Sequence, residues 1–92
     1  MRILIVNVNT TESMTEAIGA QARRAAAPGT EIVALTPRFG AESVEGNFES
    51  YLCAVGVMDA VMRYDQPFDA VIQAGYGEHG REGLQELLEV PV

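Results

Sequence analysis

The sequence predicts an α/β protein: a three-layer sandwich with helices on both faces of a parallel sheet. Three aliphatic runs of strand length, residues 2–6, 31–36 and 68–74, alternate with longer stretches of helical periodicity. Strands that alternate with helices pair in parallel through right-handed crossovers, which carry the helices onto the faces of the sheet. The 92 residues are enough for one domain with a single core.

The first expected strand, residues 2–6, is almost continuously apolar, as in strands covered on both faces. A polar loop and a helix follow, and Pro28-Gly29 ends the helix. Two capping patterns compete for the start of this helix, Ser13 with Glu16 and, one turn earlier, Asn9 with Glu12. Its expected buried stripe is Met14, Ala17, Ile18, Ala22 and Ala25.

After the second expected strand, a loop without periodicity leads to a longer helix over about residues 48–64, which Pro67 stops. The third strand runs into a glycine-rich turn, residues 75–80, and a short last helix. The order βαβαβα is typical of flavodoxin-like sheets, and Val90-Pro91-Val92 is expected to begin a fourth strand. The expected stripe of the long helix is Phe48, Tyr51, Leu52, Val55, Met58 and Met62.

Charge and composition exclude several classes of function. Thirteen acidic residues against six arginines, with no lysine, give a net charge of −7, which disfavours nucleic acid and anionic membrane surfaces as partners. No apolar stretch is long enough to span a membrane, and no signal peptide is recognisable, so we expect a cytoplasmic protein. One cysteine and one histidine cannot assemble a metal cluster or an internal disulfide, and no metal is expected.

Parallel sheets bind ligands beyond the carboxyl ends of their strands, which directs attention to residues 7–13, 36–47 and 75–80. Asn9, Thr10 and Thr11 lie between a strand and a helix N-terminus, where amide, hydroxyl and backbone donors suit an anionic ligand. Ordinary helix capping is the alternative function of these three side chains.

The glycine-rich turn contains Gly75, Gly77 and Gly80 in the spacing G-x-G-x-x-G. Its place after the third strand disfavours a dinucleotide, so the turn reads either as a generic ligand loop or as a tight turn. Glu78 and His79 are the only adjacent acid and imidazole, and an exposed structural histidine is the favoured alternative to proton transfer. Cys53 lies within the long helix and reads as a buried, unreactive thiol.

Four segments together resemble the hydantoin-racemase branch of the aspartate/glutamate racemase superfamily. Residues 7–11 (NVNTT) resemble its N-P-N-T-T motif, and residues 45–48 (EGNF) its E-G-[HN]-[YF] segment. Residues 68–80 (FDAVIQAGYGEHG) resemble its [FY]-D-A-x-V-x-A-C-F-G-D-P-G segment, and residues 85–92 the run into a fourth strand. The resemblance covers the whole chain in order.

This resemblance implies a chain of about twice the length, with two facing α/β lobes. Each lobe supplies one cysteine, and the two cysteines act as acid and base on opposite faces of an acidic α-carbon without a cofactor. Residues 1–92 would be the N-terminal lobe, and the second lobe would be absent. The loop containing Asn9, Thr10 and Thr11 would hold a small carboxylate or hydantoin-type substrate, with Tyr76 and Gly77 beside it.

Gly75 stands where the resemblance places the first-lobe cysteine, so this chain cannot use the two-cysteine route. We expect the chain to be inactive by itself, and a cysteine restored at position 75 to raise racemisation in the complete protein. His79 or Glu78 could replace the missing base, or the protein could resemble arylmalonate decarboxylases, which use one second-lobe cysteine. A carboxylate-binding or oligomerisation module without catalysis is the remaining alternative, with nucleotide binding a weaker one. An open sheet edge also predicts a homo-oligomer.

Overall fold

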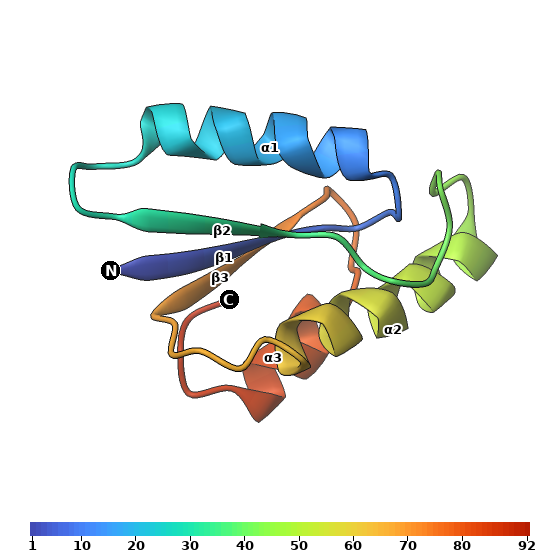
Figure 1. The fold of residues 1–92 in the computed structure, drawn as a ribbon. Coiled ribbons are helices and arrows are strands. Elements are labelled where there is room, and N and C mark those ends of the chain that lie inside the picture. Colours follow the sequence, from blue (N-terminus) through green and yellow to red (C-terminus); the bar gives the residue numbers. More distant parts are fainter.

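The computed structural model describes all 92 residues, and it has six regular elements in alternating order (Figure 1). Each strand leads into a helix, as expected from the alternation of strand-length and helical segments. The elements are β1 (Arg2–Asn7), α1 (Glu12–Ala25), β2 (Glu31–Leu35), α2 (Asn47–Met62), β3 (Ala70–Ala74) and α3 (Arg81–Leu87).

The three strands form one parallel sheet in the order β2-β1-β3, with Ile5 of β1 opposite Ala34 and Ile72. Figure 1 shows α1 on one face of this sheet and α2 with α3 on the other. Right-handed crossovers account for this arrangement, because the chain passes from β1 to β2 in one direction and from β2 to β3 in the opposite one. The predicted fold class, an α/β three-layer sandwich with a flavodoxin-like sheet, is therefore confirmed.

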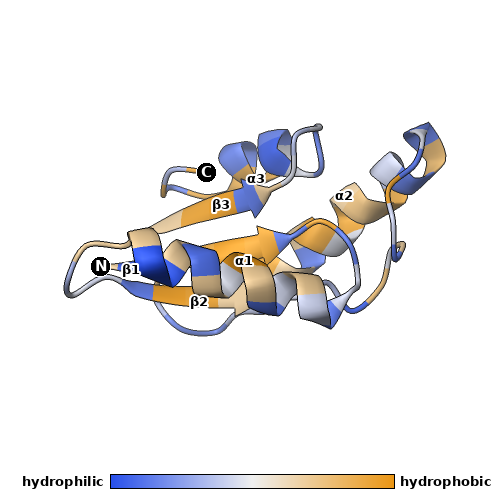
Figure 2. Ribbon diagram, turned by 90° about the horizontal axis from the view of Figure 1, so that it is seen from above, coloured by the Kyte–Doolittle hydropathy of each residue, from blue (hydrophilic) through white to orange (hydrophobic).

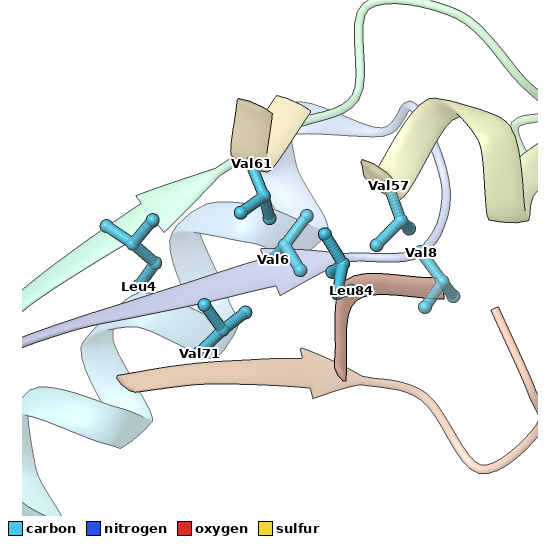
Figure 3. Close-up of a cluster of buried hydrophobic side chains, with 7 residues drawn as sticks. All are labelled: Leu4, Val6, Val8, Val57, Val61, Val71 and Leu84. Atoms are coloured by element: carbon cyan, nitrogen blue, oxygen red, sulfur yellow. The ribbon is translucent and has the colours of Figure 1, made fainter. Parts of the chain in front are cut away.

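The hydrophobic core lies between the sheet and the pair α2–α3 (Figure 3). Successive strand residues point to opposite faces, so alternate residues of β1 reach this side. Figure 2 shows that the strands are mostly hydrophobic, whereas the helices contain both hydrophobic and hydrophilic residues. The fully or almost fully buried members are Leu4, Val6, Val8, Val57, Val61, Val71 and Leu84.

The expected start and stripe of α1 were both wrong. The helix begins at Glu12 with Thr11 as its N-cap, so neither predicted capping pair is used, and no side chain caps the first turn. Thr15 and Gly19 are its buried residues, whereas Met14 is 49 % exposed. A Cβ on Gly19 would lie 3.0 Å from the Cβ of Ala34, so the helix packs closest to β2 where its side chains are smallest.

The expected stripe of α2 was also wrong, because the large apolar side chains lie on its outer face. Phe48 and Tyr51 are 75 % and 72 % exposed. The buried face consists of the smaller residues Cys53, Gly56, Val57 and Val61. Periodicity alone did not separate the two faces of α2, since both are apolar. The face with the smaller side chains is the one that approaches the sheet and the segment 37–41.

The last residues lie beside the free edge of β3. The backbone N–H of Val71 donates to the carbonyl of Pro91 at 2.9 Å, and Val90 and Val92 pack against the core. Such contacts suit the expected start of a fourth strand, although only this one bond joins the segment to β3. None of the helices combines the length and the apolar character that crossing a bilayer requires.

Candidate functional site

Asn7 organises the loop between β1 and α1, and its side chain is 2 % exposed. Its Nδ2 donates to Oδ1 of Asn9 at 2.8 Å, to the carbonyl of Thr11 at 3.2 Å and to Oγ1 of Thr15 at 3.1 Å. Its Oδ1 accepts from the backbone N–H of Asn9 at 3.2 Å. Its two N–H groups are shared among these three acceptors, and a buried amide hydrogen-bonded through both its nitrogen and its oxygen fixes the loop in one geometry. The signal for this role was an asparagine at the end of an otherwise aliphatic strand.

The predicted binding residues Asn9, Thr10 and Thr11 leave a set of donors without protein partners. Oδ1 of Asn9 accepts from the N–H of Thr11 at 3.0 Å in an Asx-turn, and Oγ1 of Thr11 donates to the carbonyl of Glu42 at 3.2 Å. Nδ2 of Asn9, Oγ1 of Thr10 and the N–H groups of Glu12 and Ser13 make no hydrogen bond within the chain. All of these groups belong to the loop before α1 or to its first turn.

The second loop follows β3, and Gln73 holds it in shape. Its Nε2 donates to the carbonyls of Gly75 and Gly77, both at 3.1 Å, and its Oε1 accepts from the N–H of His79 at 3.0 Å. Sequence reasoning missed Gln73, and a polar side chain near the end of a buried strand was the available signal. The glycine-rich segment is therefore a tight turn braced by one side chain.

The two loops are neighbours because β1 and β3 pair in the sheet. Asn7 is opposite Ala74 in the register, which places the residues after them side by side. A depression of about 380 Å³ lies on the side of the turn and is lined by Ile18 of α1 and residues 73–76, with no residue of the asparagine loop in its lining. Tyr76 is fully exposed at this edge. The asparagine loop and the turn 75–77 thus form one candidate site at the carboxyl end of the sheet.

The structure separates His79 and Glu78 from each other. His79 is 5 % exposed, so the expectation of an exposed histidine was wrong: its ring packs against Gly77, and Nε2 lies 3.5 Å from Oγ of Ser50. Its Nδ1 is buried without a partner. Glu78 turns to α3, where it accepts from the N–H of Glu82 at 3.2 Å and lies 3.6 Å from Arg81.

The site therefore offers hydrogen-bond donors and no thiol. Cys53 is completely buried in α2, as predicted, and Gly75 carries no side chain. No group of three or more His, Cys, Asp or Glu side chains lies close enough to hold a metal ion. The pKa of Arg2 is raised by its hydrogen bond to Glu31, but this pair lies at the amino end of the sheet, away from the site.

We expect Gln73→Glu to lower the free energy of unfolding by about 0.5–1.5 kcal/mol, because hydrogen bonds are lost and an oxygen faces two carbonyl oxygens. Hydrogen exchange of residues 75–80 should accelerate, since this side chain is the brace of the turn. The matched control is Gln85→Glu, whose side chain donates only to the carbonyl of Val92 at an exposed position. Equal effects of the two substitutions in thermal unfolding would contradict the bracing role.

Comparison with known proteins identifies the family of this chain. Residues 3–92 match the family Asp/Glu/Hydantoin racemase. The chain is 34 % identical to a hydantoin racemase from Pseudomonas sp. (strain NS671) over 93 residues, and 34 % identical to one from Paenarthrobacter aurescens over 94 residues. Both alignments cover all of this chain but only 37 % and 40 % of those relatives.

Two solved structures have the same fold over the whole chain. An allantoin racemase from Pseudomonas fluorescens superposes with a TM-score of 0.97 at 82 % identity, and one from Klebsiella pneumoniae with 0.94 at 44 %. This chain covers 39 % and 38 % of them. The family match over residues 3–92 and the shared fold agree, and the chain belongs to the Asp/Glu/Hydantoin racemase family.

Proposed function

We propose that residues 1–92 are the N-terminal lobe of an enzyme that removes and returns the proton at an acidic α-carbon. The substrate is a hydantoin-type ring such as allantoin. The observation that carries the proposal is the set of unpaired donors at Asn9, Thr10 and the first turn of α1, at the carboxyl end of a racemase-family sheet. The substrate names borne by the relatives agree with such a ring.

The chemistry of the ring explains why donors are needed. Loss of the proton beside a ring carbonyl moves negative charge onto the carbonyl oxygen. Donors already oriented toward that oxygen stabilise the charge without reorganising, which is a large contribution in enzymes of this kind. Nδ2 of Asn9 and Oγ1 of Thr10 are free to do this, and the bonds from Asn7 hold their loop in place. No cofactor enters this proposal.

The proton itself must be carried by another group, because Gly75 has no side chain to exchange one. The chain spans well under half the length of the relatives that it matches. A second lobe with its own cysteine would supply the missing acid or base, and residues 1–92 alone would not racemise. Of the two candidate bases in this lobe, Glu78 reaches solvent, whereas His79 is buried.

The same glycine favours a second candidate function, a decarboxylase-like reaction in which one cysteine delivers one proton. The non-catalytic alternative is a module that binds the carboxylate or the ring and does not convert it. We further propose that the complete protein is a cytoplasmic homo-oligomer. The net charge of −7 on residues 1–92 argues against nucleic acid and anionic membranes as partners of this lobe.

The experiment follows the ring proton of allantoin in deuterated water by proton NMR, with optical rotation in parallel. The complete protein that contains these 92 residues should exchange the proton faster than buffer alone, and the 92-residue chain should not. Thr10→Val should slow exchange roughly 10- to 100-fold if its hydroxyl stabilises the developing charge. The matched control is Thr30→Val, at the opposite end of the sheet.

Three results would count against the proposal. Exchange no faster than in buffer, with allantoin and 5-substituted hydantoins alike, removes the racemase function. Release of carbon dioxide from an arylmalonate instead selects the decarboxylase-like candidate. Equal rates for the Thr10 and Thr30 variants remove the role of the loop.

A further inference from the structure

Val8 and Gly75 are the first residues beyond the paired ends of β1 and β3, and they are in direct contact. A Cβ built on Gly75 would lie 2.7 Å from Cγ1 and 3.2 Å from Cγ2 of Val8. Real side chains essentially never approach to 2.7 Å, so any residue larger than glycine at position 75 requires Val8 to move. The next neighbour, Nε2 of Gln73, would be 3.3 Å away.

The backbone does not require glycine at this position. Positive φ angles occur only at Gly29, Gly40 and Gly80, so the conformation at residue 75 is open to ordinary side chains. The requirement comes from the space that the Val8 methyl groups occupy.

Val8 has little freedom to give way. It is 9 % exposed and belongs to the core cluster with Val57 and Leu84 (Figure 3). Its branched side chain has few rotamers, and a close-packed core resists displacement of a methyl group.

We propose that Val8 and Gly75 are one steric unit that decides what this lobe presents at the carboxyl edge of the sheet. Val8 determines whether position 75 can carry a side chain, and hence whether the lobe can supply a proton-transferring group there. The functional half of this inference rests on the proposed function. Both positions differ from the racemase motifs given above, which have proline at position 8 and cysteine at position 75.

The test is a double-mutant cycle in the complete protein, with Val8→Ala, Gly75→Ala and the double variant, followed by thermal unfolding. Gly75→Ala should lower Tm by roughly 3–10 °C through overpacking. Val8→Ala should also lower Tm, because it leaves a cavity in the core. The double variant should lose clearly less than the sum of the two losses, since the new Cβ enters the space that the methyl groups left.

The control cycle replaces Gly75→Ala by Gly46→Ala, whose Cβ would lie 3.6 Å from its nearest neighbour. Gly46→Ala and Val8→Ala should add within error, as distant sites do. If Gly75→Ala and Val8→Ala add equally well, the steric unit does not exist. Should Gly75→Ala fail to fold by itself, recovery of folded protein in the double variant supports the unit, and no recovery overturns it.

The functional half is tested with Gly75→Cys. The sequence alone leads to the expectation that Gly75→Cys raises racemisation, but the contact with Val8 changes that expectation. The single substitution should not speed exchange of the allantoin ring proton, whereas the Val8→Ala/Gly75→Cys pair should raise it at least about tenfold above Val8→Ala alone, as a new acid–base group does. Faster proton exchange in the single Gly75→Cys variant, or no faster exchange in the pair, overturns the functional half of the inference. Absence of exchange in the unmodified protein refutes the proposed function and this half with it, while the Tm cycle still decides the steric unit independently.

Discussion

Replacing Gly56 by alanine is expected to lower the free energy of unfolding by about 2 kcal/mol, although alanine is the better helix former by about 1 kcal/mol. A Cβ on Gly56 would collide with the carbonyl oxygen of Phe39 and would lie 3.4 Å from the Cβ of Pro37. Since the main obstacle is backbone, either α2 or the segment 37–41 must move. In a complete protein of the length of the matched relatives, thermal unfolding should show a Tm lower by roughly 4–8 °C.

The displacement should also reach the candidate site. The segment next to Phe39 accepts the N–H of Thr10 through the carbonyl of Ala41 at 3.0 Å. Exchange of the substrate proton should therefore fall at temperatures where the variant is still folded.

The matched control for Gly56→Ala is Gly46→Ser, which adds a side chain to the same helix. Its Cβ meets no atom closer than 3.6 Å, and serine is a favoured N-cap. We expect the Tm of this variant to stay the same or rise. A Gly56→Ala protein as stable as the parent would show that α2 does not approach the 37–41 segment so closely.

Asn7→Asp is expected to cost about 3–5 kcal/mol, because it leaves a charge buried and unpaired. In place of the Nδ2 donor, a carboxylate oxygen would face Oδ1 of Asn9 and the carbonyl of Thr11, which are both acceptors. The residue is 2 % exposed, so water cannot solvate the new charge. Urea unfolding should show a much lower midpoint or no folded protein.

Asparagine to aspartate at position 9 should slow exchange of the substrate proton and leave the stability almost unchanged. Oδ1 of Asn9 is the accepting atom in both of its bonds, and its Nδ2 has no partner in the chain. Asn9→Asp should therefore keep its stability within about 0.5 kcal/mol, and exchange of the substrate proton should slow at least about tenfold, since a donor becomes a charged acceptor. Comparable losses of stability in the two variants would contradict the assignment of Asn7 to holding the loop and of Asn9 to binding the substrate.

Much of the fold could be predicted from local pattern. Aliphatic runs in the strands, Pro28-Gly29 and Pro67 as breaks, and polar residues after β1 were sufficient to predict the parallel sheet and the edge that carries the candidate site. The motif residues around Asn9 and Gly75 were sufficient for the family. These features depend on residues close together in the chain, so they are visible without tertiary contacts.

The helix faces and caps could not be predicted in this way. The α2 helix is apolar on two sides, and the side that packs is the one whose small residues, Gly56 among them, allow close approach to other backbone. His79 is buried because the turn and the α2 residue Ser50 close over it. Such outcomes depend on partners tens of residues away.

The sequence by itself determined the order of elements, the family and the absence of a thiol at position 75. Only the tertiary structure decided why that position is empty: the sheet register brings Val8 against Gly75, and the methyl groups of a buried valine occupy the space of any side chain there. The physical reason is that volume in a close-packed interior is shared between residues distant in the chain, and neither residue reveals the other through local periodicity.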